Sequence, residues 1–226
     1  MSASQFASAR ADRALGLADP SSTPARPTEA EVDPMFVDRW SPRAFAPTPV
    51  PEPILRSVFE AARWAPSSAN EQPWRFVYAR TAEDRERFAG GLMEMNRGWA
   101  RSAPVLAFLL ARKRVRAGPY AGQPNPTAWF DAGAAWMSLA LQAHLRGLAT
   151  HAMGGIDRDR VLALLGASPE EYDAVIAIAL GYRGEASTLP APLAERERPS
   201  PRLPFREVVS EGTVRLDDPS AGVAGD

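Results

Sequence analysis

The segment from Ala128 to Arg146 carries the most apolar helical pattern in the chain, and it constrains the fold more than any other segment. Its apolar side chains nearly encircle the helix, so a stable structure has to cover this helix on all sides. Gly133, Ala134 and Ala135 let a neighbouring element approach closely, and Gly147 ends the helix. We therefore expect a central, buried helix over residues 128–146. Its large apolar residues are Trp129, Phe130, Trp136, Met137, Leu139, Leu141 and Leu145.

Two continuous apolar runs, Val105–Ala111 and Ala174–Leu180, are typical of strands that are covered on both faces. Trp74–Ala79 is a third strand pattern, and Thr150–Met153 is a short extended one. Helical patterns lie between these segments without strict strand–helix alternation, so the sequence predicts an α+β fold. The predicted helices cover residues 53–65, a segment that starts at Thr81, and a segment between Asp157 and Gly166.

The chain has 226 residues and 45% hydrophobic composition, which suits one domain, because single cores stop growing near ~250–300 residues. Residues 1–30 are rich in Ala, Ser, Pro and Thr, and we expect a flexible N-terminal tail or a loosely docked arm. Residues 31–211 form the predicted domain, and residues 212–226 form a C-terminal tail.

The composition excludes several classes of function. The absence of cysteine removes disulfides, iron–sulfur clusters and thiolate metal sites. No carboxylates cluster with His144 and His151, the two histidines of the chain, so we predict no metal site. A net charge of -1 gives no general basic field for nucleic acid or an anionic membrane. No stretch approaches ~18 unbroken apolar residues and no secretory signal is apparent, so we expect a cytoplasmic protein.

The first polar cluster is Arg39-Trp40-Ser41-Pro42-Arg43. Almost all the positive charge of the chain is arginine, whose planar fork suits phosphate. In a helical turn the two arginines would share one face, and Ser41 before Pro42 has the pattern of a helix N-cap. The cluster could then offer two guanidinium groups, a hydroxyl and free backbone donors to one phosphate. A solvated turn with a structural cap is the alternative, and the spacing alone favours it.

The second cluster is the loop A-P-S-S-A-N-E-Q-P-W at residues 65–74, between a predicted helix and a predicted strand. Its hydroxyl and amide side chains could hydrogen-bond the polar edge of a planar heterocycle, because an amide both donates and accepts. A turn that satisfies its own Ser and Asn side chains is equally consistent with these residues.

Three further segments are candidates. In G-L-A-T-H-A-M-G-G at 147–155, paired glycines would let backbone N–H groups approach a ligand. His151 is an acid, a polar contact or a structural residue, and a lone histidine is more often structural. In E-R-E-R-P-S-P-R at 195–202, alternating charge is typical of a solvated segment, although one arginine could fold back onto a phosphate. The loop at 113–127 is long enough to be functional. Dinucleotide-binding, P-loop and serine-hydrolase motifs are absent from the sequence.

The first two clusters, in this order, resemble the nitroreductase family. That family opens with R-x-S-x-R/K-x-F and continues with A-P-S-S-x-N-x-Q-P-W. The chain reads R-W-S-P-R-A-F from Arg39 and A-P-S-S-A-N-E-Q-P-W from Ala65. Later segments are similar too: W-A-R-S-A-P-V-L at 99–106, D-A-G-A-A at 131–135 and A-I-A-L-G-Y at 177–182. The resemblance covers roughly residues 35–210.

The resemblance implies a central, mainly antiparallel sheet flanked by helices, in an interlocked homodimer that holds FMN at two sites shared between the subunits. It implies that NADH or NADPH gives a hydride to FMN N5 and that electrons then pass to a nitroaromatic, a quinone or a related small acceptor, in a ping-pong scheme. The flavin performs the redox step, so no catalytic side chain is predicted. Dehalogenation, azoline oxidation, flavin breakdown and non-enzymatic flavin binding are the alternatives.

The resemblance also implies roles for particular residues. FMN phosphate and ribityl contacts fall to Arg39, Ser41, Arg43 and Arg202. The isoalloxazine ring lies along His151, Ala152, Gly154 and Gly155. The partner subunit contributes Pro66, Ser67, Ser68 and Asn70, with Gln72 as a brace for their loop. The loop at 113–127 and the pair Trp129–Phe130 are candidates for a wall that selects acceptors, and ordinary packing is an equal alternative for them.

Overall fold

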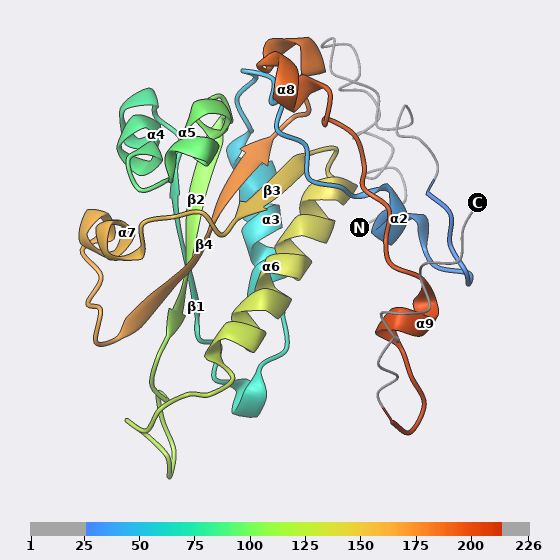
Figure 1. The fold of residues 1–226 in the computed structure, drawn as a ribbon. Helices are drawn as coiled ribbons and strands as arrows, with labels where there is room; N and C mark the ends of the chain where they lie inside the picture. Colours follow the sequence, from blue (N-terminus) through green and yellow to red (C-terminus); the bar gives the residue numbers. More distant parts are fainter. Residues whose placement is uncertain (1–25, 214–226) are drawn as a thin grey trace, which may run out of the picture.

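An antiparallel sheet organises the part of the chain that the structure describes, which is residues 26–213 of a computed structural model. The strands lie in the order β1-β2-β4-β3, and each pairs antiparallel with its neighbour. They are β1 (Trp74–Ala79), β2 (Val105–Arg112), β3 (Ala149–Met153) and β4 (Tyr172–Gly181). Each lies where the sequence predicts extended structure, and the α+β fold is confirmed (Figure 1).

Helices cover both faces of the sheet (Figure 1). One face carries α3 (Glu52–Arg63) and α6 (Ala128–Leu145). The other face carries α4 (Ala82–Ala89), α5 (Glu94–Ala100) and α7 (Arg158–Leu165). Successive β2 side chains alternate between the two cores, with Leu109 on the α3–α6 side and Phe108 on the other. Because a strand has a period of two, a continuous apolar run is what burial on both faces requires.

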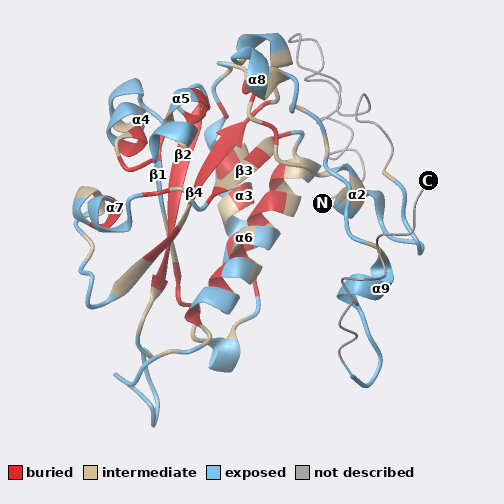
Figure 2. Ribbon diagram, viewed as in Figure 1, coloured by how far each residue is buried: buried red, intermediate tan, exposed pale blue. Residues whose placement is uncertain are grey.

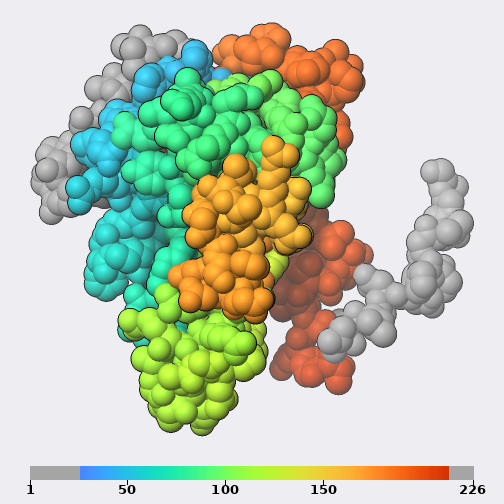
Figure 3. All heavy atoms as spheres, turned by 90° about the vertical axis from the view of Figure 1, so that its left-hand side faces the viewer, coloured from blue at the N-terminus to red at the C-terminus, as the bar shows by residue number. Residues whose placement is uncertain are grey.

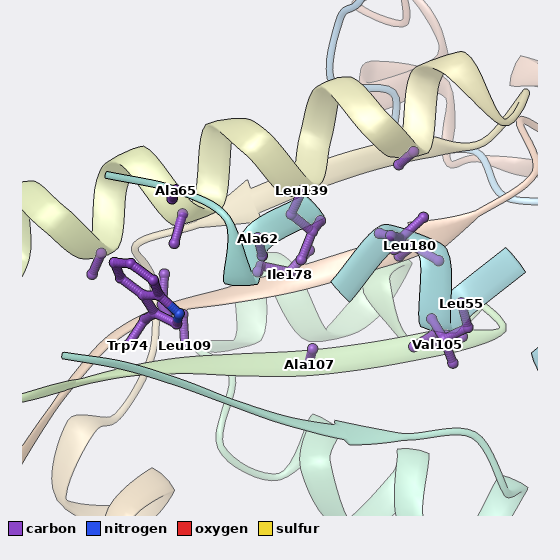
Figure 4. Close-up of a cluster of buried hydrophobic side chains, with 14 of the residues drawn as sticks. Leu55, Ala62, Ala65, Trp74, Val105, Ala107, Leu109, Leu139, Ile178 and Leu180 are labelled. Atoms are coloured by element: carbon purple, nitrogen blue, oxygen red, sulfur yellow. The ribbon is translucent and has the colours of Figure 1, made fainter. Parts of the chain in front are cut away.

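Figure 4 shows the core between α3, α6 and the sheet. Leu55 and Ala62 of α3 and Leu139 of α6 meet Ile178 and Leu180 of β4, and none of these side chains is more than 1% exposed. The face of α6 that enters this core is otherwise built mainly from alanine. Small side chains let the helix axis approach the sheet closely.

The outer face of α6 is exposed, which corrects the prediction of a helix covered on all sides. Figure 2 shows buried and exposed turns alternating along this helix. The buried positions repeat at helical spacing, as Ala132, Ala135 and Leu139 illustrate. On the opposite side, Phe130 is 81% exposed and Leu145 is 48% exposed. The described part of the chain therefore leaves one apolar side of α6 uncovered.

Local signals in the sequence set several helix ends. The Thr81 hydroxyl accepts a hydrogen bond from the backbone N–H of Asp84 at 3.1 Å, at the start of α4. The Asp157 carboxylate accepts from the N–H of Arg160 at 3.0 Å, at the start of α7. Gly166 ends α7 with a φ of 63°, a left-handed conformation that favours glycine. All three predictions of helix ends are confirmed.

The remaining elements are short, and all but η3, which lies between α3 and β1, are near the ends of the described chain. They are α2 (Pro34–Asp38), η3 (Ser68–Asn70), η4 (Ala186–Thr188), α8 (Ala191–Ala194) and α9 (Phe205–Val208). From α8 the chain runs past α2 to α9 (Figure 1). The Glu29 carboxylate accepts the backbone N–H of Phe205 at 2.8 Å, so the two terminal segments are joined.

The predicted tails, residues 1–30 and 212–226, lie mostly outside the described residues, so these boundaries stay predictions. Within residues 26–213, every helix is too short or too polar to cross a bilayer. The loop at 113–127 projects from one end of the molecule, as the space-filling view shows (Figure 3). It is held at its base, where the backbone N–H of Arg116 donates to the Glu71 carboxylate at 2.8 Å.

Candidate functional site

A group of guanidinium side chains gathers where α2 ends. Arg39 follows α2, and its Nη1 lies 3.5 Å from the Ser41 hydroxyl. Burial, followed by the charges of Arg26 and Arg202, lowers the pKa of the Arg39 guanidinium. Arginine still keeps its charge under such a shift. Asp38 offsets this charge only in part, so the three side chains form a positive cluster that an anion such as a phosphate would neutralise.

Glu197 occupies the backbone donors that follow Pro42. Its Oε1 accepts the N–H of Arg43 at 2.6 Å and the N–H of Ala44 at 2.8 Å. The predicted helix N-cap at Ser41 is wrong, because the chain from Trp40 to Arg43 is not helical and these N–H groups are already bonded. The prediction of a fully solvated segment at 195–202 is also wrong at Glu197, whose side chain is 4% exposed.

His151 joins β3 to the first cluster. Its Nδ1 lies 3.0 Å from the carbonyl oxygen of Pro42, and since a carbonyl only accepts, Nδ1 carries the proton. The imidazole also packs on Trp99, with ring centroids 4.6 Å apart. Burial lowers the pKa of His151 most, the hydrogen bond to the Pro42 carbonyl opposes this shift, and the charges of Arg43 and Arg39 lower the pKa further. The side chain is therefore neutral at pH 7 and acts as a fixed donor to the Arg39–Arg43 segment.

The turn after β3 is held by a residue that the sequence reasoning missed. Asn96 of α5 donates from Nδ2 to the carbonyl of Gly155 at 3.1 Å. A side chain at Gly155 would bring its Cβ to 2.6 Å from that Nδ2, whereas the space around Gly154 is open. Asn96 and Trp99 are three residues apart on α5, so both reach β3 and its turn from one helix face. The three-residue spacing of Asn96 and Trp99 was the sequence signal that could have identified Asn96.

The second cluster is a tight turn that is largely satisfied by its own side chains. The backbone N–H of Gln72 donates to the Ser67 hydroxyl, and Gln72 Nε2 donates to the Asn70 carbonyl, both at 3.0 Å. Ala69, Asn70 and Gln72 all have positive φ, which is uncommon for residues other than glycine. The turn is thus held in an unusual conformation, with Gln72 as a brace.

The second cluster is anchored to the start of α6. The backbone N–H of Ser68 donates to Asp131, a buried carboxylate in the first turn of that helix, at 3.3 Å. The N-terminus of a helix favours such a negative charge. The second cluster also contacts the loop at 113–127, because the backbone N–H of Arg116 donates to the Glu71 carboxylate.

The first and second clusters lie at opposite ends of α6. His144, in the last turn of α6, has a pKa that responds to Asp38 and Arg39, after the larger effect of burial. From Asp131 to His144 a helix rises by roughly 20 Å. Figure 1 shows the same arrangement, with the η3 turn below the start of α6 and α2 beside its end. One chain therefore brings the first cluster together with His151 and Arg202, but not with the second cluster.

The two aromatic residues at the start of α6 differ in their surroundings. Trp129 donates from Nε1 to the Asp173 carboxylate at 2.9 Å, and the Arg158 guanidinium lies over its ring. Phe130 is 81% exposed. The described residues contain no cluster of His, Asp and Glu that could hold a metal ion.

Comparison with known proteins agrees with this arrangement. A family model described as the nitroreductase family matches residues 37–97 and 91–182, which include the first two clusters and β3. The chain belongs to the nitroreductase family. The resemblance seen in the sequence is thereby confirmed.

Two curated nitroreductase relatives are similar in sequence. A protein of Streptomyces coelicolor, named NADH dehydrogenase/NAD(P)H nitroreductase, is 45% identical over 91 residues, a match that spans 40% of this chain and 45% of that relative. A protein of the same name from Xanthomonas oryzae is 28% identical over 197 residues, spanning 79% of this chain and 94% of that relative.

Solved structures of nitroreductase fold superpose on the chain. An oxidoreductase described as containing FMN is 47% identical, with a TM-score of 0.80 over 84% of this chain and 97% of that chain. A nitroreductase of Desulfovibrio desulfuricans in complex with FMN is 25% identical, with a TM-score of 0.64 over 83% of this chain and 100% of that chain.

Proposed function

We propose that the chain is an FMN-dependent oxidoreductase that uses NADH or NADPH and reduces a nitroaromatic, a quinone or a related small acceptor. The observation that carries the proposal is the guanidinium cluster around Arg39 and Ser41, whose charge Asp38 offsets only in part, next to β3. The FMN of the two neighbouring structures described above supports the choice of cofactor.

The first cluster suits the phosphate of FMN. A phosphate monoester carries a charge of about −1.5 to −2 at pH 7 and three acceptor oxygens. Arg39 and Arg43 lie on either side of Ser41 in the sequence, and the charge of Arg202 lowers the pKa of Arg39. Glu197 already binds the backbone donors, so this chain would hold the phosphate mainly by side chains, with Ser41 as an additional donor.

The end of β3 suits a planar heterocycle. β3 lies at the edge of the sheet, so one side of its backbone is not paired with another strand of the described chain. His151 is fixed by Pro42 and Trp99, and the space at Gly154 is open. Backbone groups of Ala152, Gly154 and Gly155 would then hydrogen-bond the polar edge of the flavin.

We also propose that the complete site needs a second copy of the chain. The turn that carries Pro66, Ser67, Ser68 and Asn70 lies at the far end of α6 from the first cluster, so the partner subunit would supply it. The exposed apolar side of α6, with Phe130 and Leu145, provides a surface for such a dimer. Two copies in antiparallel order would bring the start of one α6 near the end of the other.

When bound, FMN supplies the redox chemistry, taking a hydride from NAD(P)H and passing electrons to the acceptor in ping-pong order. The residues of the chain bind and orient the cofactor. Arg39, Arg43 and Arg202 would neutralise its phosphate, Ser41 would donate a hydrogen bond to it, and His151 keeps the Arg39–Arg43 segment in place against β3. The exposed Phe130 and the loop at 113–127 are our candidates for the surface that selects acceptors.

The proposal is tested with the purified full chain. It should be yellow or take up added FMN, and NADH or NADPH should bleach the flavin without air. An acceptor panel should then restore the colour, and sedimentation should give a dimer. A colourless protein that does not take up FMN would contradict the proposal. Bound FMN that neither nicotinamide reduces would favour another flavin reaction or a flavin-binding protein.

A further inference from the structure

Arg26 lies in the N-terminal arm, outside the motif that opens the family's pattern. Its Nη2 donates to the backbone carbonyl of Arg39 at 2.8 Å, across 13 positions of the chain. Its Nε is buried and has no hydrogen-bond partner among the described residues. A buried N–H without an acceptor is unfavourable, so a bound ligand with acceptor oxygens would stabilise the Arg26 side chain in this position.

The charges around Arg26 point to the same kind of acceptor. Burial and the positive charge of Arg202 lower the pKa of the Arg26 guanidinium, and Asp38 opposes this shift. Arg26 in turn lowers the pKa of Arg39. The partly buried guanidinium groups of Arg26 and Arg39 and the exposed one of Arg202 thus repel one another, and Asp38 offsets this repulsion only in part. An anion with several acceptor oxygens would reverse this repulsion.

The arm is held where such a contact is possible. Glu29 accepts the backbone N–H of Phe205, close in sequence to Arg202. Asp33 then begins α2 by accepting the N–H of Met35 at 2.9 Å, and α2 leads directly to Arg39. The segment from Arg26 to Asp33 therefore connects the first cluster to the C-terminal segment.

We propose that Arg26 is a phosphate-binding residue, which donates to the phosphate of FMN beside Arg39 and Arg202. The N-terminal arm would then be part of the cofactor site and would close over the phosphate. The proposal rests on the proposed function, since it takes FMN as the ligand.

The experiment compares the binding of FMN and of riboflavin, which lacks the phosphate, by full-length variants. Arg26→Ala removes the side chain. Arg26→Gln keeps a terminal amide that can donate to the Arg39 carbonyl but removes the charge. Arg160→Ala is the matched control, because Arg160 is an exposed arginine on α7, across the sheet from α6.

Both Arg26 variants should bind FMN roughly tenfold more weakly or worse, as expected when one charged hydrogen bond is lost, with unchanged riboflavin affinity. Arg160→Ala should bind both ligands like the wild type. The inference is overturned if Arg26→Gln binds FMN like the wild type, since Arg26 would then only hold Arg39 in place. It is also overturned if FMN and riboflavin weaken equally. Wild-type protein that binds no FMN would instead refute the proposed function.

Discussion

The Glu197 carboxylate accepts the backbone N–H of Arg43 at 2.6 Å, although 154 positions separate the two residues. The same oxygen accepts the N–H of Ala44, and the second carboxylate oxygen lies 3.9 Å from the Arg43 guanidinium. A segment near the C-terminus thus fixes the backbone and one side chain of the first cluster.

Glu197→Ala should lower the free energy of unfolding by about 1–3 kcal/mol, because two backbone N–H groups lose their acceptor in a place that water reaches poorly. Glu197→Gln keeps an amide oxygen as acceptor, so its loss should be smaller. Urea unfolding of the FMN-free variants measures both. Equal stability of Glu197→Ala and the wild type would show that water replaces the carboxylate.

Arg39→Ala and Arg43→Ala should each weaken FMN binding by about 1–3 kcal/mol, the range for a hydrogen bond to a charged group. The reason is that each substitution removes one guanidinium group that would bind the phosphate. Fluorescence titration with FMN measures the effect, and Arg160→Ala serves again as the control. If neither substitution changes the affinity, the phosphate lies elsewhere.

The stability of the chain should fall as the pH drops through the range below about 6.5, because the unfolded histidines take up protons there while the folded ones resist. Burial is the first cause of the lowered pKa of both His151 and His144. Both histidines have a lower pKa in the folded chain than in the unfolded chain, so the folded chain binds fewer protons than the unfolded chain as the pH falls. Their contribution to stability is complete above the unfolded pKa and is lost as the pH falls through the folded pKa.

His151→Asn keeps a donor near the position of Nδ1 and removes the titration. The variant should lose less stability than the wild type between about pH 7 and about pH 5.5. Chemical unfolding at several pH values measures the slope. Carboxylates such as Glu60, whose pKa the adjacent Arg63 and Trp64 lower to about 2, change stability at lower pH. If the dependence of stability on pH is the same in the variant and the wild type, the pKa of His151 does not change on folding.

Gly155→Ala should destabilise the chain by about 1 kcal/mol, because the new methyl group displaces Asn96 from its hydrogen bond to the Gly155 carbonyl. In an Asn96→Ala background the same change should be nearly neutral, which a double-mutant cycle measures. Gly154→Ala is the matched control, since its Cβ would meet open space. Additive effects of the two substitutions would contradict the predicted clash.

Local features of the fold could be predicted from the sequence because their causes are local. The strand at Trp74–Ala79 lies between Pro73 and the helix cap at Thr81, and the caps at Thr81 and Asp157 need only the three residues that follow each. These interactions form within one turn of helix, so a short window of sequence contains all the partners.

The missed features depend on contacts between distant segments. Glu197 stands in a run of alternating charge that is typical of solvent, and only the folded chain brings it to Arg43. The exposed side of α6 was missed for a related reason. An apolar pattern shows that a helix face has to be buried, but it does not show whether the burying residues belong to the same chain. Membership of the nitroreductase family could be predicted, because its motifs are continuous in the sequence.

The length of α6 has a genetic consequence. It separates the Arg39 cluster from the Ser68 turn, so a chain damaged at one end still carries an intact half-site at the other. If a cofactor site combines the two ends from different subunits, mixing two inactive variants, one with Arg39→Ala and one altered at the Ser68 turn, should create hybrid dimers with one undamaged site. Two faulty copies of the gene would then complement each other, and two faults at the same end would not.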